Sequence, residues 1–192
     1  IGSTIRECAS NALDSHRRAG CDKPVIVSFK RNNQANTYEF AVEDFGIGLD
    51  ADDVRNIISK YGKSTKRNSN TELGMMGLGF KAPLAYASSF YFTCRKDGVE
   101  RKYMMYEGED TNSIDLIYEN PTTEKNGVKV IIPVSRSDRW DFENKIKEQR
   151  QQTEPSTIQQ QQQTESHNEM MKWHNEVYYC HRQEGQQQWE WR

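Results

Sequence analysis

The chain has 192 residues and a formal net charge of −2 at pH 7, which leaves room for one domain with a sizeable core. This slightly acidic balance gives no electrostatic drive toward nucleic acid or anionic membranes. No run approaches the roughly 20 apolar residues that span a bilayer, so we expect a soluble chain. Because the first residue is Ile, we also expect a fragment without its natural start.

The four cysteines show no paired C-x-x-C spacing, so neither a zinc site nor a disulfide framework is predicted. They are Cys8, Cys21, Cys94 and Cys180. A reducing, cytoplasmic location fits this usage best.

The first third of the chain predicts a helix, two strands and a second helix. The first helix covers residues 5–16 and ends before Gly20; strands 24–29 and 37–43 follow, joined by a polar turn. The second helix begins at Asp50–Asp53 and ends at Gly62. Residues 62–73 lack periodicity and are rich in turn formers and cations, so we predict a mobile lid there.

The middle of the chain predicts a helix over Gly77–Ser88 with a glycine-rich entry, and then four strands. The strands are 90–96, 99–106, 114–118 and 128–134. Helices and strands in this irregular order favour an α/β fold. We expect a two-layer sandwich of a mixed, largely antiparallel sheet with helices on one face.

The last quarter changes in composition. Residues 138–152 predict a charged helix, and glutamine then dominates to the end of the chain. We therefore divide the chain into a domain over 1–135, a charged linker helix over 136–152, and a Gln-rich extension over 153–192 that is partly disordered or docks elsewhere.

Three histidines in this extension, His167, His174 and His181, recur at every seventh residue. Side chains two helical turns apart cannot share one metal ion without a second element. We favour a partner-facing or solvated helix over a metal site.

The first helix places Glu7, Asn11 and Asp14 on one face, opposite an apolar face. Two carboxylates and an amide suit a general base and a magnesium ligand, although a solvated helix face shows the same residue types.

Directly after the second strand, Asp44 precedes Gly46 and Gly48 in a D-x-G-x-G pattern. An acceptor at a strand end, beside glycines that allow close backbone approach, can take a hydrogen bond from an exocyclic amine. An Asp-initiated turn is the alternative interpretation.

A third pattern, G-x-x-G-x-G, places Gly74, Gly77 and Gly79 ahead of Lys81. The free N–H groups at a helix start and a nearby cation favour phosphate. Gly62-Lys63-Ser64 is not a P-loop, because Ile57 stands where that motif requires glycine.

The three motifs, in this order and with a lid before the last, resemble those of the GHKL superfamily of ATPases. The resemblance covers about residues 1 to 135. This region is similar to the nucleotide-binding domains of DNA gyrase B subunits, MutL proteins and the ninety-kilodalton heat-shock chaperones. Within the superfamily, Tyr61–Lys66 and Leu73–Tyr86 resemble the RIIA-type lysis-inhibition proteins of tailed bacteriophages. That subfamily implies a host cytoplasm, a companion RIIB-like protein or a homodimer, and contact with the inner membrane face.

The superfamily resemblance implies ATP and Mg²⁺ as ligands. Glu7 would be the general base for the attacking water, Asn11 would coordinate magnesium, and Asp14 would support that shell or the sugar side. Asp44 would receive the adenine amine.

The glycines have implied roles as well. Gly46 and Gly48 would shape the adenine pocket. Gly74, Gly77 and Gly79 would hinge the lid and cradle phosphate, with Lys81 or Lys63 adding charge.

The sequence departs from the superfamily at Val128, where relatives often carry a threonine that helps to fix adenine. Two functions follow from the resemblance: a slow, magnesium-dependent ATPase whose lid closure switches a partner or further domain, or a module that senses ATP or scaffolds a complex without turnover. A histidine kinase is disfavoured, because its usual asparagine is Glu7 here.

Overall fold

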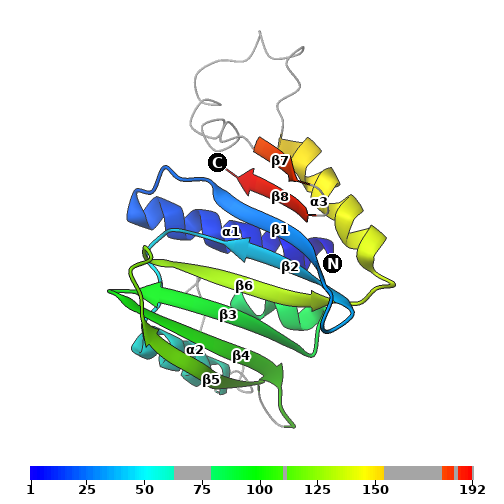
Figure 1. Ribbon diagram of the computed structural model, residues 1–192. Helices are drawn as coiled ribbons and strands as arrows, with labels where there is room; N and C mark the ends of the chain where they lie inside the picture. Colours follow the sequence, from blue (N-terminus) through cyan, green and yellow to red (C-terminus); the bar gives the residue numbers. More distant parts are fainter. Residues whose placement is uncertain (63–78, 110–111, 154–178, 184–185, 192) are drawn as a thin grey trace, which may run out of the picture.

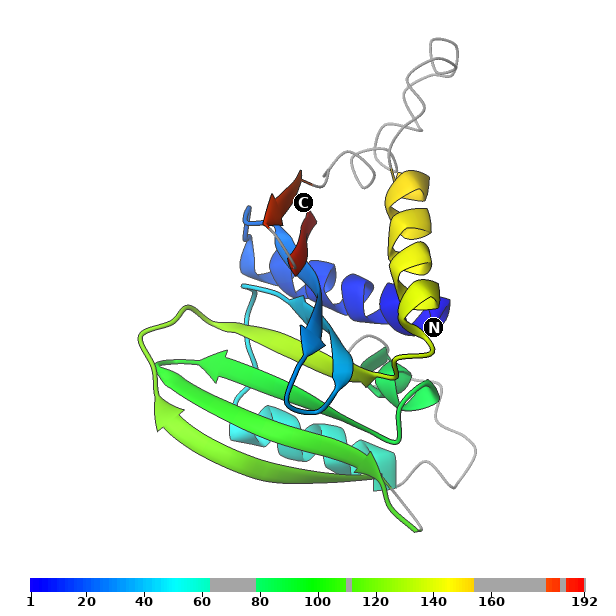
Figure 2. The same cartoon turned by 45° about the vertical axis from the view of Figure 1, so that its right-hand side comes forward.

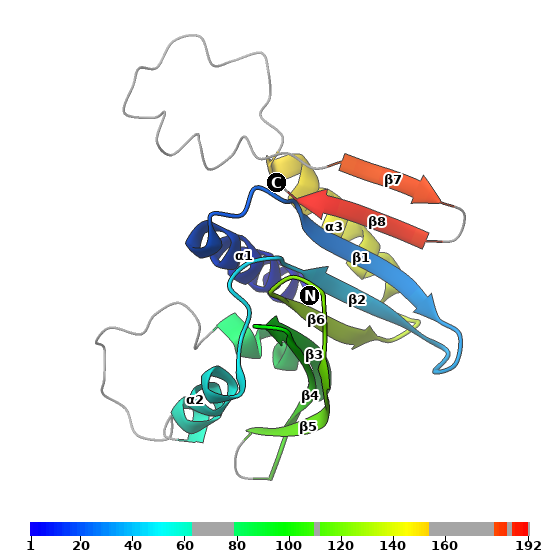
Figure 3. The same ribbon diagram turned by 60° about the vertical axis from the view of Figure 1, so that its left-hand side comes forward.

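The computed structural model describes residues 1–62, 79–109, 112–153, 179–183 and 186–191. Within these ranges the chain forms one eight-stranded sheet with helices packed against one face (Figures 1 and 3). This is the α/β sandwich that the sequence predicts. The segment predicted as a lid lies almost entirely outside the described residues.

The strands are β1 (Val25–Asn32), β2 (Thr37–Glu43), β3 (Ser89–Lys96), β4 (Val99–Glu107), β5 (Asn112–Pro121), β6 (Gly127–Val134), β7 (Tyr179–Gln183) and β8 (Gln186–Trp191). Their order across the sheet is β5-β4-β3-β6-β2-β1-β8-β7. We expected a mixed sheet, but every pairing among the described strands is antiparallel.

Alternating apolar side chains explain why one face of the sheet is covered. Along β1, Val25, Val27 and Phe29 are buried, and the same alternation places Phe90 and Phe92 of β3 in the core. Helices α1 (Gly2–Ala19) and α2 (Ala51–Gly62) lie over this face (Figure 3). The left-handed Gly20, with φ of 60°, ends α1 as predicted.

The helix predicted over Gly77–Ser88 is different in the structure. Its described part is a 3₁₀ helix, η1 (Gly79–Ala85), and strand β3 already begins at Ser89. Pro83 explains the difference, because proline has no N–H to donate to the carbonyl four residues earlier. Thr4 of α1 holds η1 in place through a hydrogen bond from its Oγ1 to the Ala82 carbonyl at 3.1 Å.

Helix α3 (Arg139–Thr153) matches the charged helix expected from the sequence, and it packs beside α1 (Figure 2). Gln149 Nε2 donates to the Gly2 carbonyl at 2.9 Å. Phe142 and Ile146 are completely or almost completely buried. The Phe142 ring contacts the rings of Phe29 and Phe40. Despite its charge, α3 therefore contributes to the core.

Strands β7 and β8 come from the Gln-rich extension and were not predicted. They form a hairpin, and β8 pairs with β1, so that β7 lies at one edge of the sheet (Figure 1). His181 lies in β7, so a helical stripe of histidines running through it is wrong. No helix in the described part of the chain is long and apolar enough to cross a membrane.

Candidate functional site

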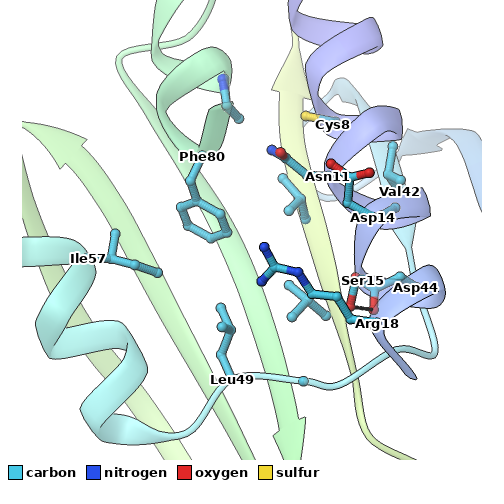
Figure 4. Close-up of a pocket in the computed structure, with 15 residues that line it drawn as sticks. Cys8, Asn11, Asp14, Ser15, Arg18, Val42, Asp44, Leu49, Ile57 and Phe80 are labelled. Carbon is cyan, nitrogen blue, oxygen red and sulfur yellow. Dashed lines mark hydrogen bonds between the residues drawn. The ribbon is translucent and has the colours of Figure 1, made fainter. Parts of the chain in front are cut away.

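A pocket opens between α1, the covered face of the sheet, α2 and η1 (Figure 4). Helix α1 supplies its polar wall, and strands β2 and β6 supply its floor. The described residues that line it are Cys8, Asn11, Ala12, Asp14, Ser15, Arg18, Val42, Asp44, Gly48, Leu49, Ile57, Phe80, Pro83, Val128 and Val130.

Asp44 is the buried acid of this pocket, with 5% of its surface exposed. Its Oδ1 accepts hydrogen bonds from Ser15 Oγ at 3.0 Å and from the Gly46 N–H at 2.9 Å. Its own N–H donates to the Val128 carbonyl at 2.8 Å. Burial raises the pKa of Asp44 to about 6, and the two hydrogen bonds to its carboxylate oppose that rise. The carboxylate is thus fixed in place and ionised at neutral pH.

The glycines after Asp44 are required by close backbone approach. A Cβ at Gly46 would lie 2.1 Å from Ser15 Oγ and 2.5 Å from the Ser15 carbonyl carbon. Gly48 has a φ of +67°, and a Cβ there would lie 2.1 Å from the Arg95 carbonyl oxygen. Both glycines let the loop after β2 lie directly between α1 and the sheet.

His16 fastens the same loop to α1. The Phe45 N–H donates to His16 Nε2 at 2.7 Å, and the His16 side chain is buried. The accepting Nε2 must therefore carry no proton. Consecutive residues of α1, Ser15 and His16, thus bond to consecutive residues of the loop, Asp44 and Phe45.

Two of the three polar residues predicted on α1 line the pocket. Asn11 and Asp14 lie on its wall (Figure 4), where the Asp14 carboxylate accepts from Arg17 Nη1 at 2.9 Å. Glu7 lies one turn before Asn11; it is exposed and is not on the pocket wall formed by the described residues.

The glycine-rich motif is only partly described. Lys63, Gly74 and Gly77 lie outside the described residues, and Gly79 is the first residue of η1. Lys81 is half-buried, and burial lowers its pKa. It does not line the pocket in the described part of the chain, where η1 contributes Phe80 and Pro83 instead.

The remaining wall is apolar and was mostly missed from the sequence. Five aliphatic side chains form a surface that suits the face of a flat ring: Val42, Leu49, Ile57, Val130 and Val128, the last at the position where relatives often carry threonine. These side chains come from four separate elements, so no local pattern joins them.

Ser15 and Arg18 were also missed, although a signal was present. Ser15 follows Asn11 by four positions and Arg18 follows Asp14 by four, which is the helical spacing that keeps side chains on one face. Counting one helical turn on from Asn11 and from Asp14 would have found them.

The helix-covered antiparallel sheet defines an α/β-sandwich domain, and its pocket combines a buried, doubly hydrogen-bonded carboxylate with an apolar slot. A family model described as "Histidine kinase-, DNA gyrase B-, and HSP90-like ATPase" matches residues 3–172, and the chain belongs to this family. Membership of this family indicates that the domain binds ATP, and ATP is the expected ligand of the pocket. A comparison with curated proteins finds no match.

Proposed function

We propose that this domain binds ATP in the pocket under α1, hydrolyses it slowly with magnesium, and uses the nucleotide state to switch a partner or a further domain. The observation that carries the proposal is Asp44, a fixed carboxylate at the inner end of an apolar slot. An ionised acceptor in this position selects a base with an exocyclic amine, as adenine has.

The polar wall of α1 fits a magnesium ion bridged to phosphate. Asn11 offers an amide oxygen, a ligand type that Mg²⁺ accepts while it keeps several waters. No cluster of three or more His, Cys, Asp or Glu side chains forms a metal site among the described residues, so Asn11 would share the ion with the phosphates. Bound there, the ion would neutralise developing charge on the phosphate oxygens.

Glu7 is the proposed base. One turn from Asn11, its carboxylate would orient the attacking water and accept its proton. The exposure of Glu7 gives specific support to a second candidate, a domain that senses ATP without turnover. In either case, we propose from the sequence that the predicted lid over residues 62–73 closes over the nucleotide. Gly74, Gly77 and Lys63 would then contact the phosphates.

The experiment measures ATP affinity and magnesium-dependent phosphate release on the same preparations. Glu7→Ala should retain ATP affinity and lose turnover at least about 100-fold. Glu124→Ala, an exposed glutamate on the loop before β6, is the control and should change neither. Undiminished turnover in Glu7→Ala contradicts the base assignment. Tight binding without turnover in the unmodified chain favours the sensor, and no ATP binding contradicts both candidates.

We further propose a phage RIIA-like role in the host cytoplasm, with a homodimer or a RIIB-like partner. Its support is the resemblance of Tyr61–Lys66 and Leu73–Tyr86, half of whose residues lie outside the described part of the chain. An adjacent RIIB-like reading frame, and co-purification of its product, would support this role. A neighbourhood without phage genes would contradict it.

A further inference from the structure

Arg18 stands on the same face of α1 as the predicted ligand-binding residues. It follows Asn11 by seven positions and Asp14 by four, so the helix brings all three to one side. Arg18 lines the pocket, and Figure 4 shows its guanidinium reaching away from α1 toward the side that carries Phe80.

Arg18 is the one cation on the pocket wall formed by the described residues; Asp14 and Asp44 are the charged residues that share this wall. Asp14 is already paired with Arg17. Within the part of the chain that the structure describes, Arg18 makes no ion pair, and its side chain is exposed at the pocket mouth. Among these described residues its charge is therefore left for a ligand.

The place of the Arg18 guanidinium relative to Asn11 and Asp44 indicates which part of a nucleotide it would contact. A base amine held by Asp44 lies beside Ser15, and phosphates held near Asn11 lie one turn closer to the start of the helix. Arg18 follows Ser15 by three positions, and in Figure 4 its guanidinium reaches into the pocket at a level between the labelled Asn11 and Asp44 side chains. This position corresponds to the junction between the sugar and the phosphate chain.

We propose that Arg18 binds the phosphate nearest the sugar of the bound nucleotide, so that α1 itself supplies a phosphate-binding cation in addition to the predicted Lys63 and Lys81. This inference rests on the proposed ATP-binding function. A guanidinium presents several donors in a planar fork, which matches the oxygens of a phosphate better than an ammonium does. Arg18 thereby distinguishes nucleotides from nucleosides.

The test compares adenosine, AMP and ATP as competitors of a fluorescent ATP analogue. Arg18→Gln should weaken AMP and ATP to a similar degree, about tenfold each, and leave adenosine unchanged. Arg18→Lys should recover part of the loss because it keeps the charge without the fork. The control is Arg6→Gln, an exposed arginine of α1 away from the pocket wall, which should change none of the three affinities.

Other outcomes overturn the assignment. An equal loss for adenosine means that Arg18 covers the base or sugar, and a loss confined to ATP means that it contacts a later phosphate. Unchanged affinities in Arg18→Gln mean that it contacts no ligand. If the unmodified chain binds none of the nucleotides, the proposed ATP-binding function itself fails. A thermal melt of each variant verifies that α1 is still folded.

Discussion

Ser15 Oγ donates a hydrogen bond to Asp44 Oδ1 at 3.0 Å, joining residues that are 29 positions apart in the chain. Ser15 directly follows the last acid of the helix motif, and Asp44 opens the D-x-G-x-G motif. The bond therefore fixes the two motifs relative to each other. It also determines which Asp44 oxygen stays available, because Oδ1 already accepts from Ser15 and Gly46.

Ser15→Ala is expected to weaken ATP binding about tenfold, because a hydrogen bond to a charged acceptor contributes about 1.5–3 kcal/mol and orients the carboxylate. The Ser15 hydroxyl lowers the pKa of Asp44, so its removal should raise that pKa further. Titration calorimetry at several pH values measures both effects. Ser3→Ala, an exposed serine of the same helix, is the control. Unchanged affinity and pH dependence would show that Asp44 is positioned without Ser15.

Gly46→Ala is expected to displace the loop after β2 and to abolish most of the ATP affinity. The new Cβ would meet backbone atoms of Ser15 at 2.5 Å, and backbone of a buried helix cannot move away cheaply. We expect a loss of about 2–4 kcal/mol in the free energy of unfolding, measured by urea denaturation. Gly2→Ala is the matched control, because its Cβ would make only an ordinary contact at 3.7 Å. Equal stability of the two variants would contradict the close approach of loop and helix.

The raised pKa of Asp44 predicts opposite pH dependences for stability and for binding. Between about pH 4 and about pH 6 the folded chain holds a proton on Asp44 that the unfolded chain has lost. The free energy of unfolding should thus fall as the pH rises through this window. The shift from 3.8 to about 6 is about 2 pKa units, or about 3 kcal/mol. Asp44→Asn should remove this contribution, which urea denaturation of both chains across the window measures.

Binding should change in the other direction, because only the ionised carboxylate is purely an acceptor for a base amine. Adenosine affinity is expected to fall progressively as the pH drops below about 6. Adenosine avoids the titrating phosphates of ATP, so the change can be assigned to the protein. An affinity that stays constant from pH 7.5 to pH 5 would mean that Asp44 does not receive the amine.

The sequence predicted those strands and helices in which apolar and polar side chains alternate or repeat at regular spacing. Strand β3 was predicted over 90–96 and covers Ser89–Lys96. Strand β5 was predicted over only 114–118, because its register shifts opposite Lys102/Tyr103 and the exposed Leu116 and Ile117 obscure the alternation. Strand β8 was missed, since glutamines give no apolar alternation and its partner β1 lies about 160 positions earlier in the chain.

The candidate site likewise contains features that local sequence predicts and features that it does not. Asn11 and Asp14 could be predicted to share a face, because helical spacing alone determines it. The bond between Ser15 and Asp44 could not, because it depends on how the loop after β2 returns to α1. The contribution of Phe80 depends on the position of η1, which Thr4 fixes from α1 through Ala82. Contacts that tertiary packing creates leave no local trace in sequence.

Helix α3 is expected to be part of the minimal folded unit. Phe142 is 0% exposed and its ring contacts Phe29, Phe40 and Tyr86, whereas Trp140 on the same helix is 64% exposed. Phe142→Ala should lower the free energy of unfolding by about 3–5 kcal/mol through lost burial and the cavity that remains. Trp140→Ala is the matched control and should cost less than about 1 kcal/mol.

A chain shortened to residues 1–135 tests the same point more severely. It lacks both Phe142 and Ile146, and their removal exposes the faces of Phe29 and Phe40 that α3 covers. We expect it to unfold at a lower denaturant concentration than a chain that ends at residue 153, or to aggregate on expression. Equal unfolding midpoints for the two chains would mean that α3 is a detachable linker, and the domain boundary predicted after residue 135 would then hold.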